Sequence, residues 1–288
     1  MTLVPTGDLV DRAWASRSGV LACNIVTLEH AEAIVAGAAR AAAPVVLQIS
    51  HNCVRYHGGL APIARAALAV ADDAPGDVSV HLDHAQSEDL VREAVDLGIS
   101  SVMFDASGLD DEQNVARTAR VVEACHRAGV WVEGELGEVG GKDGVHSATA
   151  RTDPAAAARY VAATGVDALA VAVGTSHARP TRDAALDLEL VRRLREAVAR
   201  PLVLHGSSSV SDAGLAAAVT AGLTKINIAT QLNRAFSGAL RASLQADPLV
   251  VDPRRYIGVG RDALAAEVER LLRLIAGASA LPGGHDAA

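Results

Sequence analysis

The stretch VSVHLDHAQSEDLVREAVDLG, residues 78–98, contains one complete strand–helix unit. Residues 78–82 form a short β-branched run of the kind found in parallel strands that are buried on both faces. Ser87 and the two acidic residues after it are typical of a helix N-cap, and Gly98 is typical of a residue that ends a helix. The stretch therefore predicts a strand, a turn and a helix at 87–97.

Similar units recur along almost the whole chain. Further strands are predicted at 20–24, 45–50, 100–105, 130–135, 168–174, 202–205 and 225–228, and further helices at 28–42, 110–128 and 187–199. About eight strand–helix repeats predict an α/β fold of the (β/α)8 TIM barrel type. An open doubly wound sheet is the alternative, but it requires a Gly-rich motif after the first strand, and Cys-Asn-Ile-Val at 23–26 does not provide one.

No linker or change in composition divides the chain, so we expect a single domain at 1–275. The longest polar, Gly-rich interruption, 137–151, is predicted to be a mobile active-site loop. The tail at 276–288 contains Pro282, Gly283 and Gly284 and is expected to be disordered.

Composition and charge exclude several classes of function. The formal net charge is −8, from 26 Lys and Arg against 34 Asp and Glu, and aromatic residues make up 2% of the chain. Both values argue against nucleic acid binding by a basic stripe or by stacked aromatic side chains. Cys23, Cys53 and Cys125 are far apart, which argues against a disulfide scaffold and fits a reducing cytoplasm. Charges near the N-terminus and the lack of an apolar stretch of roughly 18 residues predict neither a signal peptide nor a membrane span.

Histidines and carboxylates follow several predicted strands, at the end where barrel enzymes keep their active sites. The candidates are Asp83, His84, Asp105, Glu135, His177 and His205. A single His at a strand end is more often an ordinary buried polar residue, but several on one rim would each need a partner of their own. Imidazoles around one open coordination position are the ligand set of a catalytic zinc ion, so a metal site is favoured.

The carboxylates near these histidines have more than one possible role. Asp83 directly precedes a proposed ligand and is either a general acid or base beside the metal ion, or a residue that orients a histidine or caps a helix. Asp105 and Glu135 either hold the metal-binding imidazoles in place or bind metal themselves.

Small residues follow the last two predicted strands, at 206–208 and 227–230. This part of a barrel commonly holds phosphate through backbone N–H groups and hydroxyls. Spacing alone favours ordinary turns with a serine as helix N-cap, so the phosphate site stays one of two alternatives at this point.

Five motifs in this order closely resemble those of the class II fructose-bisphosphate and tagatose-bisphosphate aldolases. They are HLDH at 81–84, VEGELG at 132–137, GTSH at 174–177, LHGSS at 204–208 and KINIAT at 225–230. The match extends from about residue 24 to residue 254, most of the chain. The resemblance implies a TIM barrel, a catalytic zinc ion, reversible aldol chemistry on a phosphorylated ketose to give dihydroxyacetone phosphate, and a homodimer or homotetramer. A lysine that forms a Schiff base is then not needed.

The resemblance also implies roles for individual residues. The zinc ligands would be His84, His177 and His205, and Asp83 matches the acid that protonates the aldehyde-derived oxygen. Asp105 and Glu135 match carboxylates that bind a second or displaced metal ion in some members. The positions that match substrate contacts are Ser50, Ala178, Gly206, Ser207, Ser208, Asn227, Ile228, Ala229, Thr230 and Arg254.

Three departures from the family pattern leave the sugar open. Ala178 stands where many relatives have a glycine that meets the phosphate or a monovalent cation, and Ser209 replaces the last glycine of His-Gly-x-Ser-Gly. The loop at 140–144 is one residue shorter and lacks the usual Glu-Asp pair, so Asp143 is the stand-in for the acid that abstracts the proton. Ala229 is closer to the tagatose-type branch. The alternatives are fructose 1,6-bisphosphate, tagatose 1,6-bisphosphate or another phosphorylated keto-sugar, a phosphosugar-binding barrel without catalysis, and metal-dependent hydrolysis.

Overall fold

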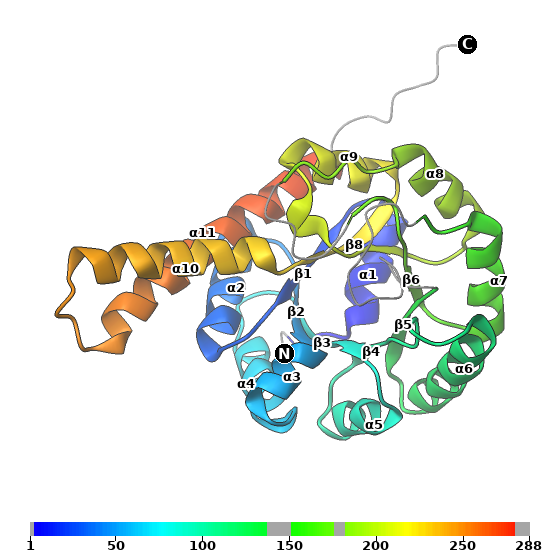
Figure 1. The fold of residues 1–288 in the computed structure, drawn as a ribbon, viewed down its shortest axis with the longest axis horizontal. Helices are drawn as coiled ribbons and strands as arrows, with labels where there is room; N and C mark the ends of the chain where they lie inside the picture. The colour runs from blue at the N-terminus through cyan, green and yellow to red at the C-terminus, as the bar shows by residue number, and fades with distance from the viewer. Residues whose placement is uncertain (1–2, 137–150, 176–181, 280–288) are drawn as a thin grey trace, which may run out of the picture.

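Eight parallel strands form a closed barrel in the computed structural model, which describes residues 3–136, 151–175 and 182–279 (Figure 1). Each strand pairs with the next one along the chain, and the last strand pairs with the first from Lys225 beside Val20 to Ile228 beside Cys23. The strands are β1 Val20–Asn24, β2 Val45–Ser50, β3 Val78–Ala85, β4 Ser101–Phe104, β5 Trp131–Glu135, β6 Ala168–Ala170, β7 Leu202–Leu204 and β8 Leu223–Ile228. The predicted (β/α)8 barrel is confirmed.

Helices surround this barrel (Figure 1). In the described part of the chain they are α1 Thr6–Ala15, α2 Leu28–Ala41, α3 His51–His57, α4 Ala61–Asp72, α5 Glu88–Asp96, α6 Asp111–Arg127, α7 Pro154–Thr164, α8 Leu188–Ala197, α9 Asp212–Ala221, α10 Thr230–Ala246 and α11 Pro253–Ser279. The predicted N-cap is present, because the Ser87 hydroxyl accepts a hydrogen bond from the Leu90 N–H at the start of α5. None of the described helices combines the length and the hydrophobicity of a membrane span.

Four strands end at different positions from those predicted, and the smallest difference is in β4, which ends at Phe104 instead of residue 105. β3 continues to Ala85 through an irregularity in its pairing with β4 between Leu82 and Ala85. β6 ends at Ala170 and β7 at Leu204. After β6 the chain leaves the barrel ladder, because Ala172 accepts a hydrogen bond from the Thr152 N–H. The predicted strand residues 171–174 are therefore buried but only partly paired within the barrel.

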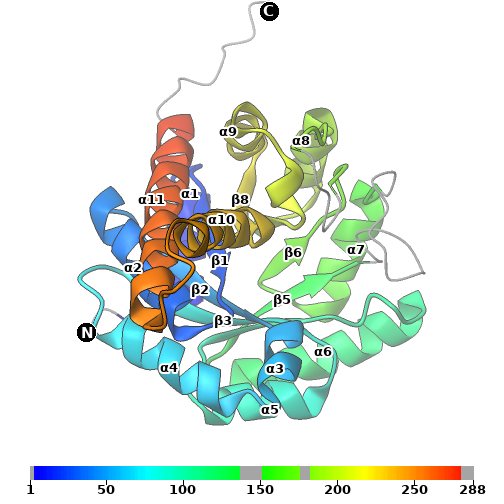
Figure 2. The same cartoon turned by 60° about the vertical axis from the view of Figure 1, so that its left-hand side comes forward.

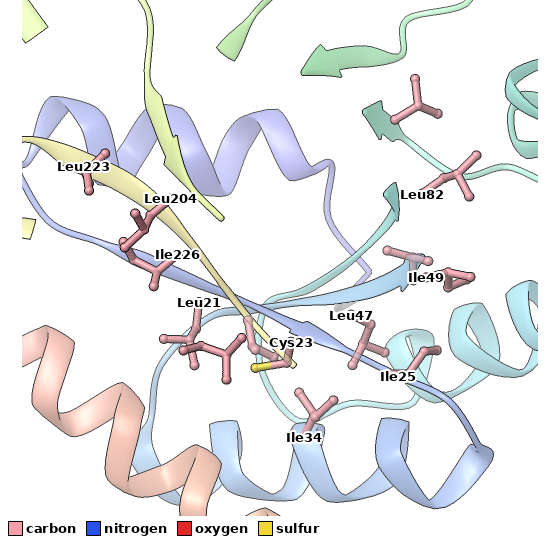
Figure 3. Close-up of a cluster of buried hydrophobic side chains, with 14 of the residues drawn as sticks. Leu21, Cys23, Ile25, Ile34, Leu47, Ile49, Leu82, Leu204, Leu223 and Ile226 are labelled. Carbon is pink, nitrogen blue, oxygen red and sulfur yellow. The ribbon is translucent and has the colours of Figure 1, made fainter. Parts of the chain in front are cut away.

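An apolar layer between the strands and the helices forms the main core. Figure 3 shows part of it, where Leu21, Cys23 and Leu47 of adjacent strands lie near Ile34 of α2. The side chains of a strand alternate between this layer and the barrel interior. The layer fixes the strands, and the alternate positions are left for the polar side chains of the interior.

The N-terminal helix α1, which the sequence did not predict, fills the end of the barrel where the strands begin (Figure 1). Leu9 and Val10 of α1 pack against Val20, Ala22 and Val46 of β1 and β2. Because this apolar contact occupies the end where the strands begin, the polar side chains of the interior lie toward the opposite end, where the strands finish.

Helices α10 and α11 form a hairpin that projects from the barrel (Figure 1). The second half of α11 returns to the barrel and lies alongside α2 (Figure 2). The segment 276–279, expected to belong to a disordered tail, is helical because α11 extends to Ser279. Residues 280–288 lie outside the described part of the chain.

Candidate metal and substrate site

His84 lies at the carboxyl end of β3 with a left-handed backbone, φ 54°. Such a conformation costs a non-glycine residue about 1–3 kcal/mol and is typical of functional sites. The Nδ1 atom of its imidazole lies 2.8 Å from Oδ2 of Asp105, and its Nε2 atom lies 3.0 Å from Nδ1 of His205. The unusual backbone therefore turns the ring toward a second imidazole across the barrel mouth.

His205 follows β7 and is fully buried. Its Nε2 atom lies 2.9 Å from Oε1 of Glu133, and its backbone carbonyl accepts a hydrogen bond of 2.7 Å from the Thr175 hydroxyl. Both ends of the residue are fixed, so its Nδ1 atom is held toward His84.

The two imidazoles fit the ligand set of one metal ion. Two nitrogens bound to one tetrahedral zinc ion with Zn–N bonds of about 2.0–2.1 Å lie about 3.3 Å apart, close to the 3.0 Å between His84 and His205. Among the described residues, candidate ligand atoms within 4.8 Å of one another come from two groups, Asp83 with both histidines, and His84 with Asp105 and Glu135.

The electrostatics of the site favour a cation. Burial alone would lower the pKa of His84, but Asp83, a hydrogen bond with Asp105 and nearby Glu135 together raise it to about 10. A proton on His84 thus occupies the position of a positive charge among three carboxylates. A divalent cation placed there would satisfy the same charges.

Asp83 precedes His84 on β3 and lies beside Ser50 in the pairing of β2 with β3. Its side chain is 3% exposed, and no described residue hydrogen-bonds its Oδ1 atom. A buried carboxylate oxygen without a partner is costly. This atom is therefore suited to contact a substrate or a metal ion at the barrel mouth.

Asp105 holds His84 in place with a carboxylate that is already bonded at both oxygens. Oδ2 bonds His84, and Oδ1 accepts hydrogen bonds from the backbone N–H and the hydroxyl of Ser107 at 3.1 and 2.6 Å. Burial opposes ionisation, but these bonds keep the pKa of Asp105 well below its usual range.

The Glu135 backbone carbonyl accepts a 3.0 Å hydrogen bond from Asn114, which fixes the end of β5.

The segments after β7 and β8 meet at the barrel mouth. Gly206 has φ 65°, a left-handed conformation that suits glycine, and a short 3-10 turn at Ser207–Ser209 follows it. The Ser207 hydroxyl donates to the Asn227 carbonyl, and the Ser208 hydroxyl lies 3.4 Å from the Ala229 N–H at the start of α10. The arrangement places hydroxyls and a helix N-terminus together, and these are groups that bind phosphate.

The family model for "Fructose-bisphosphate aldolase class-II" matches residues 4–279. The chain belongs to this family.

Known relatives agree with this assignment. The "Fructose-bisphosphate aldolase" of Geobacillus stearothermophilus is 37% identical over 272 residues, which cover 93% of this chain and 95% of the relative. The YdjI aldolase of Escherichia coli K12 superposes with a TM-score of 0.83 at 29% identity, over 95% of this chain and 97% of that chain. The fructose-bisphosphate aldolase of Campylobacter jejuni has a TM-score of 0.81 over 95% of both chains, but at 21% identity the likeness supports the fold alone. The family gives the chain aldolase activity, a carbon–carbon lyase reaction of carbohydrate metabolism on a phosphosugar.

Sequence reasoning missed two charged residues in the interior of this aldolase. Glu133 on β5 and Lys225 on β8 are fully buried, and the Lys225 Nζ atom donates to Oε2 of Glu133 at 2.8 Å. Burial alone would raise the pKa of Glu133, but Lys225 and His205 hold it well below its usual range. The strand period contained a signal, because Glu133 is two residues before Glu135, and Lys225 two before Asn227, on the same face of each strand.

Several predicted substrate residues of the aldolase lie apart from His84 and His205. Ser50 borders the mouth, and its hydroxyl caps α3 by accepting from the Cys53 N–H at 3.2 Å. The Ile228 side chain belongs to the apolar layer outside the barrel, so only its backbone faces the mouth. Arg254 is the second residue of α11, and its exposed side chain pairs with Asp252 at 2.8 Å. Within this chain, Arg254 is not brought to the site.

The remaining predictions fall outside the described residues. They concern His177 as third metal ligand, Ala178 as a substrate contact and Asp143 as proton acceptor. The proposed loop at 137–151 is likewise outside, except for Arg151.

Proposed function

We propose that this aldolase is a zinc-dependent ketose-bisphosphate aldolase. Its substrate would be fructose 1,6-bisphosphate or tagatose 1,6-bisphosphate, cleaved reversibly to dihydroxyacetone phosphate and glyceraldehyde 3-phosphate. The observation that carries the proposal is the approach of His84 Nε2 and His205 Nδ1 to 3.0 Å beside the buried carboxylate of Asp83.

His84 and His205 would hold the metal ion together with His177, and Asp105 and Glu135 would orient these ligands or hold a displaced ion. When bound, Zn²⁺ would act as a Lewis acid that stabilises the negative charge of an enediolate. The donor set of imidazoles with nearby carboxylates supports zinc over a hard cation, which prefers oxygen ligands.

The residues of the chain would bind the substrate and move its protons. Asp83 would transfer a proton to and from the aldehyde-derived oxygen, since its Oδ1 atom is buried and without a partner among the described residues. Asp143 is proposed to remove the proton next to the carbonyl group. The phosphate and triose part of the substrate would be bound by Gly206, Ser207, Ser208, Asn227, Ala229, Thr230 and the backbone of Ile228. Ala178 would also contact the substrate, beside a monovalent cation.

The assembly and location are also proposals. We propose a homodimer or homotetramer, in which the exposed Arg254 would be available to a neighbouring copy. A cytoplasmic location is supported by three free, buried cysteines, Cys23, Cys53 and Cys125.

The test is a coupled assay for dihydroxyacetone phosphate with both bisphosphates, on protein of measured metal content, with and without a chelator. We expect turnover that the chelator abolishes and that added Zn²⁺ restores, and the ratio of the two rates gives the preferred epimer. The contrary outcome is zinc-loaded protein that binds a bisphosphate but cleaves neither bisphosphate nor any other phospho-ketose offered. That result would identify a barrel that binds phosphosugars without catalysis.

A further inference from the structure

A buried charged pair lies in the barrel interior, on the side of the metal site toward the strand beginnings. Glu133 and Lys225 come from β5 and β8, which are separated in the barrel by β6 and β7, and neither side chain has measurable solvent exposure. A buried ion pair is weak evidence for a stabilising role because desolvation opposes its formation. Its hydrogen bonds to neighbouring side chains indicate a different role.

Lys225 has all three of its N–H donors engaged. Nζ lies 2.8 Å from Glu133 Oε2, 2.9 Å from Gln48 Oε1 and 3.0 Å from Asn227 Oδ1. Gln48 is held in turn, since its Nε2 donates to Asn24 at 3.0 Å. An ammonium group with three acceptors has no donor left over. Lys225 is therefore a fixed donor and is not placed to attack a carbonyl group.

Glu133 accepts hydrogen bonds at both carboxylate oxygens. Oε2 accepts from Lys225, and Oε1 lies 2.9 Å from Nε2 of His205. A carboxylate only accepts, so Nε2 of His205 carries the proton. The amide nitrogen of Asn227 lies 3.1 Å from the same imidazole atom, and its orientation is set by Oδ1, which accepts from Lys225. Because the amide nitrogen and Nε2 both carry protons, this approach is a packing contact and not a hydrogen bond.

The consequence is a defined tautomer of His205. With the proton on Nε2, Nδ1 presents its lone pair, and this atom faces Nε2 of His84. The His84 ring is also held by a carboxylate, since its Nδ1 bonds Asp105. Metal-binding histidines usually donate their other N–H to a carboxylate, which fixes tautomer and ring orientation.

We propose that Glu133 and Lys225 are a positioning pair, which holds His205 with Nδ1 directed at the metal site and holds the Asn227 side chain in the same network. This inference rests on the proposed function, because positioning His205 serves a purpose only if the site binds a metal ion. The two fail separately, however, because the tautomer of His205 is defined in the metal-free protein as well.

The first experiment measures that tautomer in the metal-free wild-type protein. Long-range proton–nitrogen correlation spectra of ¹⁵N-histidine-labelled protein, assigned with a His205→Asn variant, should show Nε2 protonated and Nδ1 unprotonated. A spectrum with Nδ1 protonated would overturn the proposal. This result does not depend on metal binding, so wild-type protein that took up neither Zn²⁺ nor Co²⁺ would count against the proposed function alone.

The second experiment measures metal affinity in Glu133→Gln, Lys225→Met and the double variant Glu133→Leu/Lys225→Met. Chelator competition with Zn²⁺ and absorption spectra of the Co²⁺-loaded proteins are the readouts. We expect affinity to fall about 10- to 100-fold in all three, the usual effect of removing such a partner, with an altered Co²⁺ spectrum. The double variant leaves no unpaired charge, so we expect its thermal stability to exceed that of Lys225→Met while its affinity stays low.

Two controls separate positioning from general damage. Ser79→Ala removes a different fully buried polar group, which lies on β3. Ile34→Val removes a methyl group from the outer apolar layer. Both should keep the metal affinity of the wild type. Wild-type affinity in the double variant would overturn the proposal, and so would an equal loss in the Ile34→Val control.

Discussion

Nε2 of His84 lies 3.0 Å from Nδ1 of His205, although 121 positions separate the two residues in the chain. The contact exists because β3 and β7 end on the same rim of a closed barrel and because the left-handed backbone of His84 turns its ring inward. Each imidazole has its outer nitrogen on a carboxylate, Asp105 or Glu133. The inner nitrogens therefore face each other at the barrel mouth.

Asp105→Ala should weaken metal binding, because Nδ1 of His84 loses its acceptor and the ring loses its fixed orientation. We expect about a 10- to 100-fold loss of Zn²⁺ affinity, measured by chelator competition. The matched control is Asp110→Ala, which removes an aspartate that caps α6 and does not touch the site. Equal affinity in wild type and Asp105→Ala would show that the carboxylate does not hold the ligand.

Asp83→Asn should separate proton transfer from metal binding. The amide keeps the shape of the side chain but is a poor acid and base, so kcat should fall about 10²- to 10⁴-fold. If Asp83 acts on the substrate, Zn²⁺ affinity stays at the wild-type value. A parallel loss of affinity would instead make Asp83 a metal ligand, as its grouping with His84 and His205 allows.

His81 should make the protein less stable in acid. It is fully buried, with Nδ1 2.8 Å from the Ser101 hydroxyl, and burial together with nearby Lys225 places its pKa well below the ordinary value, although Glu133 acts the other way. The unfolded chain therefore binds a proton below about pH 6.5 that the folded protein does not. Its contribution to stability is complete above that pH and is lost as the pH falls.

The measurement compares urea unfolding of wild type and His81→Gln between pH 7.5 and 5. Groups common to both proteins cancel in the difference between the two free energies of unfolding. Below about pH 6.5 this difference should shift toward the variant by up to about 1.4 kcal/mol per pH unit. A difference that does not change with pH would contradict the predicted neutral state of His81.

The barrel could be predicted from the sequence because its signals are local. Each strand is a short apolar run, and each helix carries its own start and stop residues, as Ser87 and Gly98 do for α5. Side chains just after the strands must then share one rim, which is why Asp83, His84 and His205 could be grouped from the sequence alone.

Other features depended on contacts between distant parts of the chain. Glu133 and Lys225 are 92 positions apart, and a charged residue inside a strand indicates neither burial nor a partner until the barrel closes. Helix α1 was not predicted, since its N-cap position is Pro5 and no side-chain hydrogen bond marks its start. The position of Arg254 near the start of α11, at the far end of a helical hairpin, likewise depends on packing and is not marked by a local motif.

Gly37→Ala should destabilise the fold, because α2 and α11 are in close contact at this glycine. A Cβ atom there would lie 2.5 Å from the Ala265 carbonyl oxygen and 2.8 Å from Cβ of Val268, so the helices would have to separate. Overpacking of this kind costs about 1–3 kcal/mol, reduced somewhat by the better helix propensity of alanine. The control is Gly238→Ala in α10, where nothing lies within 4 Å of the added atom and helix propensity alone should stabilise by about 0.5–1 kcal/mol. Urea unfolding should therefore give opposite signs for the two substitutions, and a stabilising Gly37→Ala would show that α11 does not press on α2 as the structure indicates.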